Sequence, residues 1–180
     1  MVVQEHPAWP RLTGELQRTD QMLTDYLNNM PVADREWFEP EQLAIIGAQA
    51  LGQTTEEIQS DFPELSPKDF GELYTGIYEI MGAKQSSDAI VTYRACISGL
   101  VEYDTKDWDA SYSSLGESVA IVYKARAAGY TAPEIGKLLP GSGKSMVNNA
   151  KARANKYFGS RGSLNVITCG FEYGLFARDV

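Results

Sequence analysis

Histidine, cysteine and long apolar runs are all scarce in this sequence of 180 residues. The only histidine is His6, near the N-terminus, so a single chain cannot assemble a histidine-based metal site or a nucleophile–histidine pair. Carboxylates are plentiful, but none pair on a glycine-rich strand end. We therefore expect no catalytic residue, no metal site, no cofactor and no small-molecule substrate, and a protein that is not an enzyme.

The scarcity of cysteine points to a reducing compartment. The two thiols, Cys96 and Cys169, are expected to be free, and a disulfide between them is the alternative. The start MVVQEHPAWP has no basic stretch followed by an apolar run, as a signal peptide would have. No segment approaches the roughly 18 to 20 apolar residues that span a bilayer. These absences predict a cytoplasmic protein with no membrane partner.

Positive charge is scarce overall and unevenly distributed. The net charge is −8, which on its own argues against a nucleic-acid partner. Residues 1–109 hold 7 Lys/Arg and 20 Asp/Glu, whereas residues 110–180 hold 9 and 4. An asymmetry of this size suggests that the two halves have different partners. The alternative is that both are solvated faces without a partner.

The sequence does contain a weak internal repeat. An offset of 77 places Ala48 on Ala125, Gly52 on Gly129, Thr54 on Thr131, Glu57 on Glu134 and Pro63 on Pro140. One residue then drops out before Ile90–Thr92 meets Val166–Thr168, and another before Gly99 meets Gly174. Identities are sparse, so chance similarity is the alternative. The order of predicted elements carries more weight than the identities.

Each copy begins with two predicted helices. The first has apolar residues at helical spacing and ends at Gly52 or Gly129, as a helix C-cap does. The second is short and opens with a capping box, in which a threonine precedes a glutamate by three residues and each side chain accepts from the other's backbone N–H. The boxes are Thr54 with Glu57 and Thr131 with Glu134.

A third helix and two extended runs follow in each copy. The third helices start at Ser66 and Ser142 and carry apolar stripes at helical spacing. A glycine-bearing break then leads to a pair of runs typical of a β-hairpin. These runs are Ala89–Ile97 with Leu100–Tyr103, and Leu164–Phe171 with Leu175–Arg178.

This order resembles the winged helix-turn-helix superfamily, twice over. The resemblance implies an α+β fold that is mainly helical, with two tandem winged-helix units related by the internal repeat. We expect an acidic unit over residues 38–106 and a basic unit over residues 110–180. Residues 1–37 form an N-terminal arm with a short helix from Leu16 to Leu27. The arm would pack on the first unit or on a partner, and a disordered tail is the alternative.

In helix-turn-helix proteins the third helix enters the major groove, and the third helix of the basic unit suits this role. Its outward side carries no acid. Asparagine can pair with adenine edges, and Lys and Arg can contact phosphates. The alternative is a basic face on a protein-binding module. The predicted nucleic-acid-binding residues are Lys137, Lys144, Ser145, Asn148, Asn149, Lys151, Ala152, Arg153, Lys156 and Arg161.

The third helix of the acidic unit is expected to behave differently. Its outward residues are Lys68, Gly71, Glu72, Thr75 and Glu79. The acids among them would repel phosphates, so we predict that this unit does not read DNA. It would pack against the basic unit, dimerise or dock another protein. A surface that imitates DNA phosphates is a further alternative.

The string Gly141–Ser145, GSGKS, resembles part of a phosphate-binding loop. That motif needs a glycine five residues before its final glycine, and Leu138 stands there. A capped helix, and not a strand, is also expected to precede it. We therefore interpret the string as a turn and a helix cap.

The sequence thus predicts a non-enzymatic DNA-binding regulatory protein, nucleoid-associated, that grips duplex DNA through its C-terminal unit. The N-terminal unit would serve for dimerisation or protein docking. The alternative is a tandem winged-helix adaptor or inhibitor that binds a protein complex of the transcription or chromosome machinery. A phage- or plasmid-encoded modulator of host machinery is compatible with both.

Overall fold

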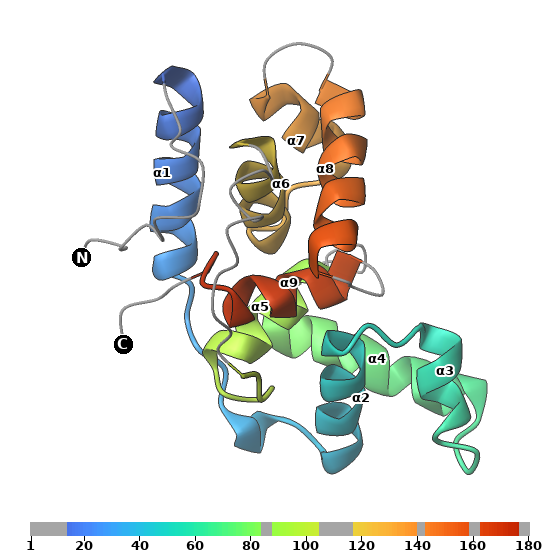
Figure 1. Ribbon diagram of the computed structural model, residues 1–180. Coiled ribbons are helices and arrows are strands. Elements are labelled where there is room, and N and C mark those ends of the chain that lie inside the picture. Colours follow the sequence, from blue (N-terminus) through green and yellow to red (C-terminus); the bar gives the residue numbers. More distant parts are fainter. Residues whose placement is uncertain (1–13, 84–87, 105–116, 140–142, 159–162, 177–180) are drawn as a thin grey trace.

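The computed structural model describes residues 14–83, 88–104, 117–139, 143–158 and 163–176, and over these ranges the chain is helical without a strand (Figure 1). The elements are α1 (Gly14–Asn28), the 3-10 helix η1 (Arg35–Trp37), α2 (Pro40–Ala50), α3 (Thr55–Ser60), α4 (Pro67–Met81), α5 (Asp88–Ile97), α6 (Glu117–Ala127), α7 (Ala132–Leu138), α8 (Gly143–Phe158) and α9 (Ser163–Glu172). None of these helices is both long enough and apolar enough to cross a membrane.

The predicted hairpins, and with them the α+β class and the wings, are wrong. Segment Ala89–Ile97 lies within α5, and Leu164–Phe171 lies within α9. β-branched and aromatic residues in both runs favoured strands, but most positions of α5 from Ala89 to Cys96 are buried. A short, continuously apolar run cannot be assigned to strand or helix by periodicity, because no polar side shows its period. Tertiary burial decided in favour of helix.

The predicted cap hydroxyls of Thr54, Ser66 and Thr131 accept the expected hydrogen bonds, whereas Ser142 lies outside the described residues. The hydroxyl of Thr54 accepts from the N–H of Glu57, and the hydroxyl of Ser66 accepts from that of Asp69. In the second copy the capping box is complete, since Glu134 also accepts from the N–H of Thr131. Gly52 and Gly129 follow the first helices with φ of 88° and 96°, a backbone conformation that favours glycine. These local signals placed the turns correctly.

The described helices follow the same order in both halves of the chain. We call α2–α5 the N-terminal copy and α6–α9 the C-terminal copy. Helices α5 and α9 have ten residues each, and both end in the same hydrogen bonds. The N–H of Leu100 donates to Ala95, and that of Leu175 donates to Gly170. The two helices therefore align at an offset of 75, one residue from the sequence alignment at Ile90–Thr92.

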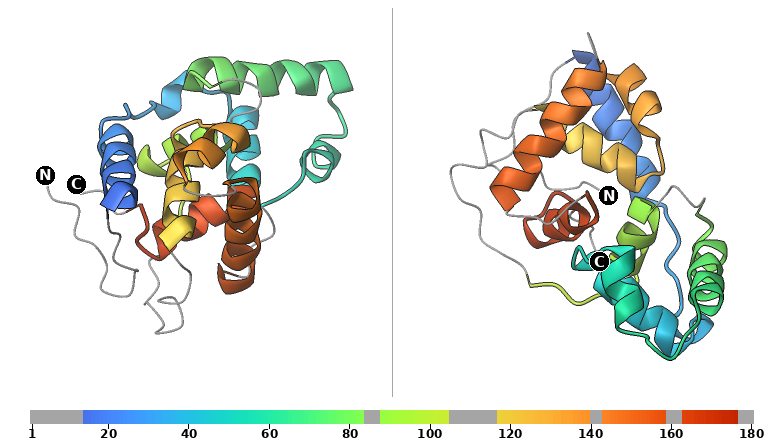
Figure 2. Two further views of the ribbon diagram at one scale, coloured as in Figure 1. Left: turned by 90° about the horizontal axis from the view of Figure 1, so that it is seen from above. Right: turned by 90° about the vertical axis from the view of Figure 1, so that its right-hand side faces the viewer.

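The two copies share one hydrophobic core. Helices α5 and α9 lie side by side at the centre, with α6–α8 on one side and α2–α4 on the other (Figures 1 and 2). The ring of Tyr93 packs against the rings of Phe171 and Phe176, with centroids 5.3 and 5.4 Å away. The hydroxyl of Thr168 donates to the Ala50 carbonyl at 2.7 Å. The predicted boundary between the two units, after residue 106, falls outside the described residues.

Helix α1 packs along α6, on the C-terminal copy. The helix of the arm thus lies on the second unit, whereas the segment that follows it contacts the first unit as predicted: Arg94 donates to the Pro31 carbonyl and the N–H of Ala33 donates to the Ser98 hydroxyl. The ammonium of Lys124 in α6 lies 2.8 Å from the Asp20 carboxylate and also donates to the Thr24 hydroxyl. The Tyr93 hydroxyl donates to the Leu27 carbonyl. The chain thus places its first helix on its second copy, with contacts to the central α5 as well.

Both cysteines are free, as predicted, and both are buried. Burial raises the pKa of the Cys96 thiol to about 12, so almost none of it is thiolate at neutral pH. Both thiols lie in the buried core.

We expect Gly129→Ala to lower the free energy of unfolding by about 2 kcal/mol, because a side chain at positive φ costs roughly 1–2 kcal/mol and this one also meets a neighbour. A Cβ on Gly129 would lie 2.6 Å from Cδ1 of Ile90 in α5. Urea unfolding measures the change. Gly71→Ala is the control, because Gly71 is exposed within α4 and has nothing within 4 Å of a new Cβ. It should gain up to about 1 kcal/mol from helix propensity. Equal effects at the two positions would contradict the packing of α5 on α6.

Candidate nucleic-acid interface

Helices α6, α7 and α8 pack against one another in all three pairings. Ile135 of α7 and Val147 of α8 are buried in the core that they share. Residues 140–142, between α7 and α8, lie outside the described part. Three mutually packed helices, the second and third separated by a short connection, present the outer side of the third to solvent.

The orientation of α8 follows from its apolar stripe. Val147, Ala150 and Ala154 recur at spacings of three and four and are all at most 2% exposed. At 3.6 residues per turn, this spacing turns one side of the helix inward. The small alanines allow α8 to lie close against α6, because two helix backbones can approach more closely across a methyl group than across a larger side chain.

The opposite side of α8 is the candidate interface, and we call it the α8 outer face. Its exposed residues are Asn148, Asn149, Ala152, Arg153, Asn155 and Lys156. Five of these were predicted for the site, and Asn155 was not. The sequence of α8 holds four basic residues and no acidic one. The face therefore combines positive charge with amide groups that both donate and accept hydrogen bonds.

The remaining predicted residues lie at the edges of this face or outside the described part. Lys137 is exposed in the last turn of α7. Lys144 and Ser145 belong to the first turn of α8, but their side chains lie outside the described part, as does Arg161 entirely. Lys151 is half-buried, and its pKa is lowered by burial and by the nearby Arg126 guanidinium. Lys151 thus lies on a flank of α8 and not on its fully exposed side.

The neighbourhood of Arg126 and Lys151 was not found by sequence reasoning. Arg126 lies in the last turn of α6, 25 positions before Lys151. The position of Arg126 in its helix could have suggested that its side chain points toward the core. No sequence pattern, however, indicates which basic residue of α8 it approaches. The same holds for the pairing of Asp20 with Lys124 across 104 positions.

The corresponding face of α4 has the opposite charge. Lys68, Glu72 and Glu79 are exposed, as predicted, and so are Gly71 and Thr75. The α4 sequence holds one basic and three acidic residues. Beside it lies an open hollow lined by Glu39, Glu41, Gln42, Leu65, Asp69, Glu72 and Leu73. An acidic surface of this kind repels a phosphate backbone.

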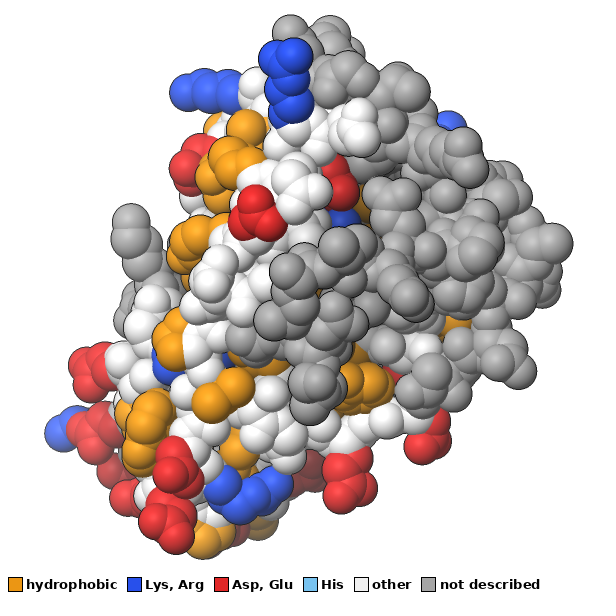
Figure 3. All heavy atoms as spheres, turned by 90° about the vertical axis from the view of Figure 1, so that its left-hand side faces the viewer, with side chains coloured by type: hydrophobic (Ala, Val, Ile, Leu, Met, Phe, Trp, Pro, Cys, Tyr) orange, Lys and Arg blue, Asp and Glu red, His pale blue; other side chains and the backbone are white. Residues whose placement is uncertain are grey.

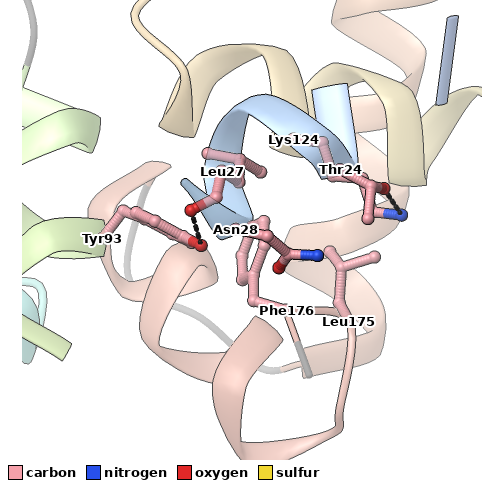
Figure 4. A pocket seen from close by; sticks show the side chains of 7 residues that line it. All are labelled: Thr24, Leu27, Asn28, Tyr93, Lys124, Leu175 and Phe176. Atoms are coloured by element: carbon pink, nitrogen blue, oxygen red, sulfur yellow. Dashed lines mark hydrogen bonds between the residues drawn. The ribbon is translucent and has the colours of Figure 1, made fainter. Parts of the chain in front are cut away.

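A small, partly enclosed cavity lies between α1, α5 and α6 (Figure 4). It has a volume of about 10 Å³ and is lined by Thr24, Leu27, Asn28, Tyr93, Lys124, Leu175 and Phe176. That volume suffices for about one water molecule. The cavity is therefore too small for an organic ligand, and the cation that lines it, Lys124, is already paired with Asp20. No group of three potential metal ligands occurs among the described residues.

Comparison of the chain with protein-family models, with curated proteins and with solved structures gives no match. The interpretation of the α8 outer face therefore depends on its own geometry and charge.

The orientation of α8 can be tested with one pair of substitutions. Ala154→Leu should lower the free energy of unfolding by about 1–3 kcal/mol, because extra methyl groups overfill a packed core. Ala152→Leu, two positions away on the exposed side, should change it by no more than about 0.5 kcal/mol. Thermal or urea unfolding measures both. A larger loss from Ala152→Leu would mean that the outer face is buried.

Proposed function

We propose that this protein is a non-enzymatic DNA-binding regulatory protein that contacts duplex DNA through the α8 outer face. The observation that carries the proposal is an exposed, acid-free helix face with Asn148, Asn149, Arg153 and Lys156. It lies on the third helix of a unit whose helix order is that of a helix-turn-helix domain.

The chemistry of this face suits the major groove. The groove, about 12 Å wide, admits an α-helix. Asn148 and Asn149 are adjacent, and an asparagine amide can donate to and accept from one adenine edge. Arg153 and Lys156 would contact the phosphates that flank the groove. Ala152, with its short side chain, allows the helix to approach the base edges closely.

The proposal does not need a wing. In helix-turn-helix domains the third helix reads the base edges, whereas further elements contact the backbone. Here α9 replaces the predicted hairpin and packs against α2, α5 and α8. It contacts the end of α8, where the rings of Phe158 and Tyr173 stack, and the residues of the α8 outer face are exposed. The net charge of −8 is compatible with this, because the acids are concentrated before residue 110.

A second candidate function, an adaptor that docks on a protein complex, is favoured by exposed apolar side chains near α1. Met22 and Tyr26 lie one turn apart on α1 and are 45% and 57% exposed. Val32 and Trp37 are exposed in the segment that follows. Figure 3 views this side of the molecule, where hydrophobic side chains alternate with acidic ones. Exposed aromatic side chains of this kind are enriched at protein interfaces.

Binding to DNA is tested by fluorescence anisotropy with random duplexes at several salt concentrations. The variant Arg153→Glu/Lys156→Glu should weaken binding by at least about 100-fold and lower the salt slope by about 1.8, or 0.9 for each phosphate that is no longer neutralised. The reason is that two cations facing the backbone become two anions.

The matched control for this experiment is Arg18→Glu/Lys68→Glu. It makes the same change of charge at exposed positions on α1 and α4. We expect it to reduce affinity by less than about tenfold, through the general field alone. If both variants lose affinity equally, or if the α8 variant binds like the unmodified protein, DNA recognition by α8 is refuted.

The adaptor function predicts a different pattern in affinity purification. One stoichiometric partner should be recovered in the presence of nuclease, and Tyr26→Ser/Trp37→Ser should release it, because it removes two exposed aromatic rings. Arg153→Glu/Lys156→Glu should retain it. Retention by the first variant and loss by the second would exclude docking through α1.

A further inference from the structure

The contacts between the two copies have the pattern of a two-fold symmetric dimer. Helix α5 packs on α9, α5 packs on α6, and α9 packs on α2. In the repeat, α2 corresponds to α6 and α5 corresponds to α9. The contact of α5 with α6 therefore corresponds to that of α9 with α2, and the contact of α5 with α9 corresponds to itself. A two-fold interface requires this reciprocity, because each contact from one subunit recurs from the other.

Individual residues repeat the pattern. Ile90 of α5 lies against Gly129, at the end of α6 in the other copy. At the offset of 75 its equivalent is Asn165 of α9. The amide of Asn165 donates to the Ala50 carbonyl, at the end of α2 and two residues before Gly52. Thus α5 and α9 each contact the glycine turn of the opposite copy, and they do so through equivalent residues, Ile90 and Asn165.

The interface is also as well buried as a permanent one. Tyr93 is 1% exposed and Ile167 is fully buried. Across it, the ring of Tyr93 contacts those of Phe171 and Phe176, and the ring of Tyr103 contacts that of Phe171. Two separate helix-turn-helix subunits would have to associate in solution to form such an arrangement. In this protein both copies belong to one polypeptide chain.

The two third helices differ in charge at equivalent exposed positions. The offset of 77 places Glu72 of α4 on Asn149 of α8, and Glu79 on Lys156. All four side chains are exposed. An acid therefore stands where α8 presents a base-reading amide and a phosphate-binding cation. Such a repulsive group excludes a ligand that the same framework could otherwise bind.

We propose that each molecule binds one asymmetric duplex site, in which α8 alone enters the groove and the N-terminal copy is a built-in, DNA-silent dimer partner. Glu72 and Glu79 keep α4 away from DNA. The ligand is a single non-palindromic block of duplex, and not a pair of inverted half-sites one helical turn apart, as symmetric dimers read. This inference rests on the proposed DNA-binding function.

The first test selects sequences with the full chain from random duplexes and measures the stoichiometry by sedimentation. We expect one block without two-fold symmetry and one chain for each duplex. A palindrome occupied by two chains would overturn this inference and leave the proposed function intact. No enrichment and no binding would overturn both.

The second test makes the N-terminal copy resemble the C-terminal one. Glu72→Asn/Glu79→Lys should bind two short duplexes for each chain, whereas the unmodified protein binds one. The second duplex should depend on salt with a slope of about 0.9 for each phosphate that the new face neutralises. Binding of a single duplex by this variant would refute the role of Glu72 and Glu79.

The control for the second test is Glu36→Asn/Glu102→Lys, which makes the same change of charge at exposed glutamates outside α4. It should still bind one duplex. A second duplex on this control would show that general charge, and not the α4 face, governs binding, and would overturn the inference. Circular dichroism of both variants checks that the helices are retained.

Discussion

The packing of α5 against α9 is the contact on which the rest of the structure depends. Tyr93 lies at its centre, where its ring meets Phe171 and Phe176 and its hydroxyl donates to Leu27 of α1. This one side chain therefore connects both copies and the N-terminal helix. Because aromatic rings bury large apolar areas, Tyr93 contributes to the free energy that joins the three parts.

The burial of α9 determines which helices of the two copies can present side chains to solvent. Helix α9 packs against α2, α5 and α8, and α5 packs against α2, α4, α6 and α9, so most of their described side chains are buried. The third helices, α4 and α8, each present a row of exposed side chains. Their charges have opposite sign, so the same framework presents an acidic face on one copy and a basic face on the other. The difference between the copies lies in their surfaces and not in their helix order.

The caps, the turns and the inward face of α8 were predicted correctly from local sequence. Thr131 and Glu134 are three residues apart, and Val147, Ala150 and Ala154 lie within about two turns of helix. Interactions over such spacings are dictated by helix geometry alone. The hairpins were predicted wrongly, because residues 89–97 and 164–171 are apolar almost throughout and show neither the period of a strand nor that of a helix.

The sequence by itself determined where most helices begin and end, which side of α8 faces outward and which copy carries the positive charge, because these depend on neighbours within a few residues. The tertiary structure alone decided that α5 and α9 are helices, that α1 lies on α6, and that Lys151 sits beside Arg126. Each of these depends on partners that are distant in the chain, such as Asp20 and Lys124. Such partners leave no periodic pattern in the sequence, since only the packed core brings them together.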